Sequence, residues 1–294
     1  ITGGVFNNTV SGSGTITGGT FNTPMTGSGT ETDPYQISTA AGLKWFRDKV
    51  NNAKTKEETK ICAVLTANID LKNEEWTPIG IGNGTRNGVP IDFPYSGTFD
   101  GNGHTISGLN VNYRNKNGGL FCYVMNATIK NLTVAGSVTH SSGDGVAYGG
   151  IVGCANSSTI ENCTVSGRLE LRAYNGMFGL GGFVGYGGGT VVIENSGFTG
   201  SVKAPGFAGA FAGNCWGTVT VRGSFTASGV KFCTKKGLSD SYNNYGNGAA
   251  EASVAKLTAE QMKGEDAKTN MPLLNWEVFW KTTSGYPVCR FLSP

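Results

Sequence analysis

The chain has 294 residues, of which 47 are Gly, roughly twice the usual ~7% share, while charged residues make up 15% against a typical ~25%. A hydrophobic share of 38% is enough for a core and Gly follows no three-residue period, so the composition excludes collagen, coiled coils and wholly disordered chains. The net charge of +3 is spread thinly along the chain, so we do not expect nucleic acid as a partner.

The chain begins with a short repeat that differs from the rest of the sequence. Residues 1–7 recur almost unchanged as residues 16–22, and each copy is followed by Ser-Gly-Ser-Gly or Thr-Gly-Ser-Gly. We expect residues 1–29 to be a Gly/Thr repeat with a period of 15 residues, or a linker. The opening residues have neither the basic region nor the apolar region of a signal peptide, as expected for a mature or trimmed fragment.

A helix is predicted over Ala40–Asn51, with Ser38 or Thr39 as its N-cap. Leu43, Phe46 and Val50 lie at helical spacing and form an apolar stripe, and Trp45 sits beside that stripe. We interpret this helix as a cap over the first strands of the main domain.

Asp100 and Asn102 lie in the segment Asp100-Gly101-Asn102-Gly103-His104, where oxygen-bearing side chains alternate as in a calcium loop. The downstream Glu of the full calcium signature is absent. The segment therefore favours a tight turn into the first coil, with a metal site as the weaker alternative. The seven Cys form no C-x-x-C pair, so buried thiols are favoured over one or two disulfides, and no cofactor is predicted.

Two motifs repeat between residues 118 and 225. The first is a Gly-Gly-apolar-apolar unit, with copies that start at Gly118, Gly149, Gly181 and Gly209. The second has the form Ile-x-Asn-x-x-apolar, with copies at 129–134, 160–165 and 193–198 and a degenerate copy near 219–225. The copies of the first motif lie 28–32 residues apart, a period that indicates a solenoid, a propeller or a repeat array.

The composition of each repeat favours a β-solenoid. Gly-Gly is costly in a helix, and the second motif is short and β-rich, so each repeat is predicted to form two or three short strands joined by turns. A propeller blade needs ~40–45 residues, which these repeats do not have. We therefore predict an all-β fold, a right-handed parallel β-helix with a short N-terminal capping helix. The predicted parts of this 30–294 domain are a cap with the first strands at 30–99, coils at 100–235 and a C-terminal cap at 236–294.

The predicted stacking brings equivalent residues of successive coils one strand spacing apart, ~4.8 Å. Asn131, Asn162 and Asn195 would form a ladder in left-handed turns. Two inward columns and one outward column are predicted on the same register. The inward columns are Leu132, Cys163 and Ser196, and then Val134, Val165 and Phe198, while the outward column is Lys130, Glu161 and Glu194.

The C-terminal region carries signals for a closing cap. Thr258-Ala259-Glu260-Gln261 matches a capping box, which predicts a short helix near Ala259–Gly264. An aromatic-rich segment with a break at Ser284-Gly285 follows and is predicted to form a final strand or hairpin. Its aromatic residues, interpreted as closing core, are Trp276, Phe279, Trp280, Tyr286 and Phe291.

Catalytic patterns are weak. Glycoside hydrolysis needs two carboxylates at ~5–9.5 Å, and Glu161 and Glu194 would be neighbours on adjacent coils. Solvated charges beside Lys130 are the favoured interpretation of this pair. No catalytic residue is assigned, because with two His no Ser-His-Asp set can be proposed.

A binding site is better supported than a catalytic one, because a solenoid offers a long face and exposed aromatic rings can stack on sugars. Tyr123 and Tyr186 occupy equivalent positions after the Gly-Gly motif, with Cys154 and Asn214 at the same position in the other coils. The candidate ligand-binding residues are Tyr123, Tyr148, Tyr174, Tyr186 and Trp216.

The order of motifs resembles bacterial surface modules with GLUG repeats. Residues 27–39, the Glu75-Trp76-Thr77-Pro78-Ile79-Gly80 segment, residues 97–109 and the closing Gly285-Tyr286-Pro287-Val288 carry this resemblance together with the Gly-Gly repeats. It implies an adhesin-like module of a larger surface or secreted protein, of a kind also found beside IgA-peptidase-like enzymes. The resemblance implies no ligand and no catalytic residue.

Three functions remain open at this point. A non-catalytic module for adhesion or for binding a glycan or a host extracellular protein is favoured, over a carbohydrate-active enzyme and over a purely structural stalk. The expected protein is extracellular or on the cell surface, monomeric, and part of a longer multidomain chain, with no membrane insertion in this fragment.

Overall fold

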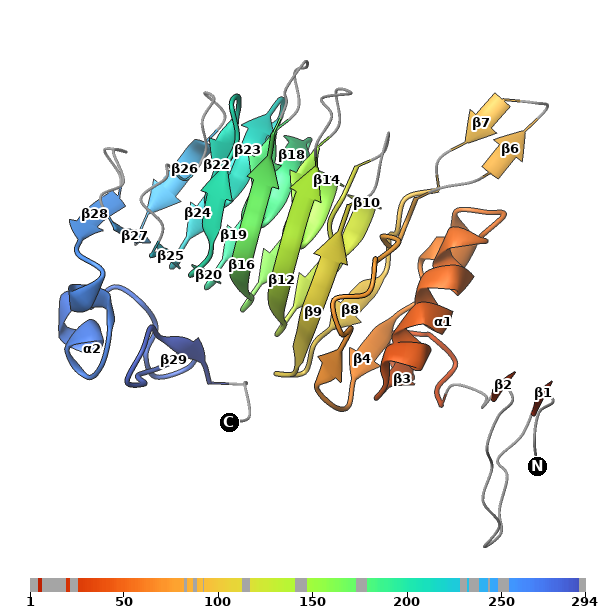
Figure 1. Ribbon diagram of the computed structural model, residues 1–294, viewed down its shortest axis with the longest axis horizontal. Helices are drawn as coiled ribbons and strands as arrows, with labels where there is room; N and C mark the ends of the chain where they lie inside the picture. Colours follow the sequence, from red (N-terminus) through yellow and green to blue (C-terminus); the bar gives the residue numbers. More distant parts are fainter. Residues whose placement is uncertain are drawn as a thin grey trace, which may run out of the picture.

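The computed structural model describes residues 5–6, 20–21, 26–81, 84–86, 89–91, 93–112, 117–140, 147–172, 179–227, 232, 238–242, 244–247 and 254–290. Its strands stack in parallel along one axis and form a β-helix (Figure 1). Helix α1 lies at one end of the stack, and α2 with β29 lies at the other end. The prediction of a parallel β-helix with a cap at each end is confirmed.

Four parallel sheets form the sides of the β-helix. The eight-stranded sheet contains β3 (Tyr35–Ile37), β4 (Ala63–Leu65), β8 (Thr98–Asp100), β11 (Thr128–Lys130), β15 (Thr159–Glu161), β19 (Thr190–Glu194), β24 (Thr218–Arg222) and β26 (Leu238–Tyr242). The nine-stranded sheet contains β5 (Ile69–Asp70), β9 (Thr105–Val111), β12 (Thr133–His140), β16 (Thr164–Leu171), β20 (Gly197–Phe198), β21 (Ser201–Lys203), β25 (Phe225–Thr226), β27 (Asn244–Asn247) and β28 (Val254–Leu257).

The Gly-Gly motifs build the two smaller sheets. The four-stranded sheet contains β10 (Phe121–Met125), β14 (Val152–Asn156), β18 (Val184–Gly188) and β23 (Ala212–Cys215), and the three-stranded sheet contains β13 (Tyr148–Gly149), β17 (Leu180–Gly181) and β22 (Ala208–Gly209). Outside the four sheets, β1 (Val5–Phe6) pairs in parallel with β2 (Thr20–Phe21), whereas β6 (Gly84–Arg86) pairs antiparallel with β7 (Val89–Ile91). The β1–β2 register spans the 15-residue period of the first repeat. The division of the chain into domains stays a prediction.

The predicted inward columns occur as expected. Val134 pairs with Val165, and Val165 pairs with Phe198, and all three side chains are buried. Ser196, the polar member of the other inward column, is also completely buried. Its hydroxyl donates to the Glu194 carbonyl at 2.8 Å and accepts from the Cys163 amide at 3.2 Å. Because both hydrogen bonds go to the backbone, a serine fits an otherwise apolar column at little cost.

Three asparagines occupy the same turn in successive coils. Asn131, Asn162 and Asn195 have φ values of 53°, 54° and 48°, in the left-handed region that Asn tolerates better than most residues. The side-chain amide of Asn162 donates to Oδ1 of Asn131 at 3.1 Å, and the amide of Asn131 donates to Oδ1 of Asp100 at 3.0 Å. These bonds run along the solenoid axis and tie the turns of Asn162 and Asn131 to the turn of the preceding coil. The side-chain ladder ends at Asn162, because its buried Oδ1 atom accepts no hydrogen bond from the described residues.

Replacing Asn162 with Ala should lower the free energy of unfolding by about 2 kcal/mol, because Ala is strained at positive φ and the bond to Asn131 is lost. Asn162→Gly removes the same bond without the strain, so its loss should be smaller. Urea unfolding followed by circular dichroism measures both variants. Equal stability of the Ala variant and the parent chain would contradict the ladder.

Helix α1 (Ala40–Asn51) has Thr39 as its N-cap, and the Thr39 hydroxyl accepts from the Gly42 amide at 3.1 Å. Leu43, Phe46 and Val50 are buried, as the apolar stripe predicts. The ring of Phe46 lies 5.9 Å from that of Tyr95 and 5.8 Å from that of Phe99, so the helix packs on the first coils. Within the described residues no helix combines the length and apolarity that crossing a membrane requires.

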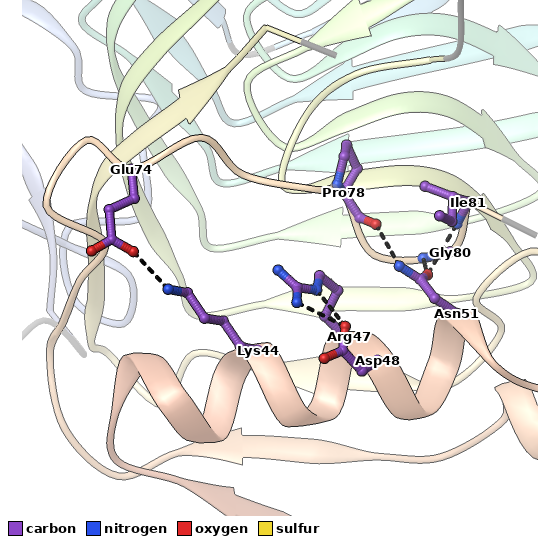
Figure 2. A network of polar contacts seen from close by, with 8 residues as sticks. All are labelled: Lys44, Arg47, Asp48, Asn51, Glu74, Pro78, Gly80 and Ile81. Carbon is purple, nitrogen blue, oxygen red and sulfur yellow. Dashed lines mark hydrogen bonds and ion pairs between the residues drawn. The ribbon is translucent and has the colours of Figure 1, made fainter. Parts of the chain in front are cut away.

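A buried asparagine at the last position of α1 fastens the helix to a neighbouring loop (Figure 2). Nδ2 of Asn51 donates to the Pro78 carbonyl at 3.0 Å, and Oδ1 accepts from the amides of Gly80 at 2.7 Å and Ile81 at 3.1 Å. The Asn51 side chain thus bonds to three backbone groups of the loop. Buried polar groups are normally hydrogen-bonded in this way. This contact has no signal in the sequence, because Asn51 lies outside the repeats.

The C-terminal cap forms its own small core. The capping box is present, since the Thr258 amide donates to Gln261 Oε1 at 2.8 Å and the Gln261 amide donates to Thr258 Oγ1 at 3.2 Å. The helix it starts is shorter than predicted. It is a single 3-10 turn, η2 (Glu260–Met262), because Lys263 is extended, and α2 (Asp266–Asn270) follows.

Aromatic residues close the C-terminal end of the β-helix. This agrees with the prediction for the aromatic residues that the structure describes. Trp276 and Trp280 are buried, and the Trp280 ring lies 5.2 Å from that of Phe225 in the last described coils. Strands β29 (Trp280–Lys281) and β30 (Val288–Cys289) pair antiparallel and form the predicted hairpin. Phe291 lies outside the described residues.

Candidate ligand-binding site

A column of charged residues runs along the outer face of the eight-stranded sheet. The strand register aligns one residue from each of five successive coils, and these are Asp100, Lys130, Glu161, Glu194 and Arg222. Lys130 pairs with Asp100 at 3.7 Å, and Arg222 pairs with Glu194. Both ends of the column are therefore neutralised in pairs, and Glu161 lies between them.

Glu161 is the titratable residue of this column whose environment disfavours charge. Burial raises the pKa of its carboxyl group, and the neighbouring Glu194 carboxylate raises it further, while Lys130 opposes both. Glu161 and Glu194 are directly paired on adjacent strands, and a hydrogen bond with Glu194 adds to the rise in the pKa of Glu161. The pair is best described as the like-charged centre of the column, whose attractive contacts are the Lys130–Asp100 and Arg222–Glu194 pairs on either side.

Replacing Glu161 with Gln should raise the free energy of unfolding at neutral pH by about 0.5 kcal/mol, the scale of one cross-strand charge pair. The carboxyl pKa is higher in the folded state than in the unfolded state, so the native chain binds more protons between the two pKa values. Stability from this group is therefore full below the unfolded pKa and falls as pH rises through that window. The Glu161→Gln variant should lack this pH dependence of the free energy of unfolding, as measured by urea unfolding at several pH values.

Glu74→Gln provides a control of opposite sign, because Lys44 bonds to the Glu74 carboxylate at 2.7 Å and lowers its pKa (Figure 2). That variant should lose stability, most clearly near neutral pH. Stabilisation by both substitutions would show a general effect of removing negative charge, and would contradict the specific role of the Glu161–Glu194 contact.

The tyrosines predicted to bind a ligand lie in different environments. Tyr123 pairs with Cys154, Cys154 with Tyr186, and Tyr186 with Asn214, so the predicted equivalence of these positions holds. Tyr123 and Tyr186 are half-buried.

Burial raises the pKa of the Cys154 thiol to about 12, so this thiol is not a nucleophile at neutral pH.

Tyr148 requires a correction. It is one of the predicted ligand-binding residues, but it lies in β13 and is completely buried, so its ring is not available to a ligand. Trp216 is 67% exposed, directly after β23. Tyr174 lies outside the described residues. Ligand binding by Tyr123, Tyr186 and Trp216 stays a prediction.

Tyr123 is also part of a cavity of about 560 Å³, a size typical of small-molecule sites. The cavity lies between the outer side of β10 and the segment that carries η1 (Glu57–Thr59). Its lining residues are Lys56, Thr59, Lys60, Pro94, Ser96, Tyr123, Met125 and Asn126. It thus combines an aromatic ring and a thioether with hydroxyl, amide and ammonium groups.

The polar groups of this cavity, called here the Tyr123 cavity, give it a positive character. Lys56 and Lys60 are its charged lining residues. Lys60 is paired with Glu57 at 2.8 Å, but both side chains are largely exposed, so this pair is weak. The hydroxyl groups of Thr59 and Ser96 lie 3.1 Å apart and fix one wall. Such a site can hold a polar ligand that carries a negative group.

A second cavity of about 490 Å³ lies beside helix α1. Its lining residues are Tyr35, Trp45, Asp48, Lys49, Asn52, Glu58 and Ile61. It is called here the Trp45 cleft. The sequence indicated only that Trp45 borders the apolar stripe. The cleft itself was missed, because it joins α1 to β3 and to a segment that has no repeat.

The Asp100 segment forms a tight turn. Oδ1 of Asp100 accepts from the Asn102 amide at 2.7 Å, and the His104 amide donates to the Gly101 carbonyl at 2.7 Å. The Asp100 carboxylate also bonds to Asn131 and pairs with Lys130. Among the residues that the structure describes, no three His, Cys, Asp or Glu side chains lie close enough to hold a metal ion.

Five cysteines of the described region form no disulfide, namely Cys62, Cys122, Cys154, Cys163 and Cys215. Four of them are buried and Cys154 is half-buried, which fits their interpretation as small apolar residues. Cys233 and the side chain of Cys289 lie outside the described residues.

Comparison with known proteins matches residues 144–170 to the GLUG motif family. The chain carries the GLUG motif. The GLUG match spans β13–β16, which is one coil of the β-helix, and the neighbouring coils repeat its Gly-Gly and Ile-x-Asn elements. The motif therefore corresponds to one structural repeat that buries its apolar side against the coils before and after it.

Two further proteins resemble the GLUG chain. Halomucin from Haloquadratum walsbyi is 34% identical over 159 residues, which is 52% of this chain and 2% of Halomucin. The chain therefore spans a very small part of that relative. A crystal structure from Bacteroides ovatus, of a protein provisionally named an immunoglobulin A1 protease, covers 90% of this chain and 94% of its own with a TM-score of 0.55. At 21% identity this second likeness shows the fold alone.

Proposed function

We propose that this GLUG-repeat chain is a non-catalytic module of an exported surface protein, and that it binds an acidic glycan in the Tyr123 cavity. The observation that carries the proposal is the cavity itself, in which a tyrosine ring lies beside hydrogen-bonding groups and two lysines. A sugar ring can stack on the tyrosine while its hydroxyl groups bond to Ser96 and Asn126. A carboxylate or sulfate on that sugar would bind Lys56 and Lys60.

The comparisons support a surface location for this module. Halomucin is a far longer protein in which a region similar to this chain is a small part, as expected for a module within an extended chain. The β-helix suits such a role, because stacked coils expose a long face with few charged groups. The proposal also includes a monomeric state.

A glycan array that includes uronate-containing and sulfated oligosaccharides tests the proposal. The parent chain should bind acidic glycans, and Tyr123→Ala should weaken that binding at least ~10-fold, equivalent to ~1.4 kcal/mol. The proposal narrows the predicted ligand-binding tyrosines to Tyr123, so Tyr186→Ala is the matched control: Tyr186 has the equivalent register position but is not part of the cavity lining. It should bind as the parent does.

Lys60→Ala should reduce binding of acidic glycans while leaving neutral ones unchanged, and added salt should weaken the parent in the same way. An array without acidic hits, or equal losses for Tyr123→Ala and Tyr186→Ala, would contradict the proposal. Release of shorter sugars from a bound glycan would instead favour the enzymatic alternative.

A further inference from the structure

The Trp45 cleft has two aromatic walls that meet at a steep angle. The rings of Tyr35, from β3, and Trp45, from α1, have centroids 5.1 Å apart and planes inclined by 78°. Trp45 is 38% exposed, so its ring is accessible from outside. The cleft therefore offers two ring faces to one space of about 490 Å³.

A cation already lies against both rings. Nζ of Lys49 is 5.5 Å from the centroid of Trp45 and 5.7 Å from that of Tyr35. Both distances are within the ~6 Å at which a positive charge is attracted by the negative face of an aromatic ring. The two rings thus act together on a single ammonium group, which is the arrangement of an aromatic cage.

The remaining charges of the cleft also favour a cation. Asp48 and Glu58 are its acidic lining residues, and Lys49 is its basic one. Asp48 pairs with Arg47 at 2.7 Å (Figure 2), while the Glu58 carboxylate accepts from the Lys54 amide at 2.7 Å. With the Lys49 side chain moved aside, the cleft would present two carboxylates and two aromatic faces.

We propose that the Trp45 cleft binds a trimethylammonium group, with Lys49 as an internal occupant that the ligand displaces. Displacement costs little because the Lys49 side chain is exposed and its ammonium stays hydrated outside the cleft, whereas a quaternary ammonium is weakly hydrated and loses little on entering it. Lys49 is exposed and reaches solvent by rotating about its flexible stem. The Trp45 cleft shares no lining residue with the Tyr123 cavity.

Titration of the purified chain with choline chloride by isothermal calorimetry tests the proposal, with potassium chloride at equal ionic strength as the blank. Choline should bind the parent chain, and Lys49→Ala should bind it about threefold more tightly, because the competing ammonium and its cation–π contacts are gone. Trp45→Ala should weaken binding at least ~10-fold. Trp216→Ala removes an exposed tryptophan elsewhere on the chain and should leave choline binding unchanged.

Glu58→Gln should weaken choline binding about threefold and provides a second variant should Trp45→Ala disturb α1. Phosphatidylcholine vesicles show where the bound trimethylammonium group comes from. Binding to the vesicles indicates a lipid surface. Choline binding without vesicle binding indicates a soluble ligand or another polymer. Absence of choline binding in both the parent and Lys49→Ala, or a neutral sugar that binds at Trp45 while choline does not, would overturn the proposal.

Discussion

Replacing Phe211 with Ala should lower the free energy of unfolding by about 3–5 kcal/mol, the usual cost of deleting a buried phenylalanine. Phe211 is completely buried and lies between the rings of Phe183 and Phe232 in a row of aromatic side chains. Its centroid is 5.1 Å from that of Phe183 in the preceding coil, with planes 12° apart, and 4.6 Å from that of Phe232. The substitution would leave a cavity between rings from successive turns, which close-packed coils cannot collapse to fill.

Guanidinium unfolding followed by far-ultraviolet circular dichroism measures this loss. Trp216→Ala is the control, because it removes a larger aromatic side chain that is 67% exposed, and it should change stability by less than ~0.5 kcal/mol. Comparable losses for both variants would show that aromatic content, rather than the row of buried rings, determines stability.

The second large effect is expected for Gly181→Ala, which should lower the free energy of unfolding by about 3 kcal/mol or more. A Cβ at Gly181, in β17, would lie 1.9 Å from the Val184 carbonyl oxygen and 2.9 Å from the Gly213 amide nitrogen. Both neighbours are backbone atoms, so relief requires the corner between Gly181 and Val184 to open and the next coil to shift at Gly213, with loss of strand pairing. The strict need for glycine follows from the close approach of the chain to itself at this corner.

Gly285→Ala is the matched control, because its nearest neighbour would be the Thr283 hydroxyl at 3.7 Å, an ordinary contact. Its stability should lie within ~0.5 kcal/mol of the parent. Thermal unfolding of the two variants compares them directly. A Gly181→Ala chain as stable as Gly285→Ala would mean that the corner is looser than the structure shows.

The repeats determine much of the fold from sequence alone. Once the Ile-x-Asn motifs are aligned, the pairing of Ile129 with Ile160 and of Ile160 with Ile193 follows, because one register serves every coil. The capping helix was equally accessible, since Thr39 and the buried stripe define its start and its inner face. In both cases the information is local or is repeated along the chain.

Tyr148 shows where the repeat pattern is insufficient. The sequence says that a tyrosine precedes Gly149 but not where its ring goes. In the structure the ring covers Gly118 of the preceding coil, where an added Cβ would lie 2.3 Å from Cδ1 of Tyr148. The missing side chain on one coil therefore creates the space for the ring on the next. Such a contact depends on two coils at once and cannot be read from either motif.

The two cavities were inaccessible from sequence for a related reason. The Tyr123 cavity joins Lys60 to a tyrosine 63 positions further along the chain, and nothing in the non-repeating segment 56–61 indicates that it lies against β10. The Trp45 cleft uses the same segment on its other side, through Glu58 and Ile61. For the raised pKa of Glu161, the stacking predicted the neighbouring Glu194, but the sequence did not show the burial that is the larger cause.

The stacking of coils is tested most directly by a disulfide cross-link between outer positions. Lys130 and Glu161 face each other on adjacent strands, so their Cα atoms lie about 4.8 Å apart, within the range that a disulfide spans. Under mild oxidation the Lys130→Cys/Glu161→Cys variant should form an intramolecular bond, located by mass spectrometry of the digested chain. Lys130→Cys/Arg222→Cys, whose positions are three coils apart, should not. Cross-linking of the distant pair, or none in the adjacent pair, would contradict the β-helix on which the account rests.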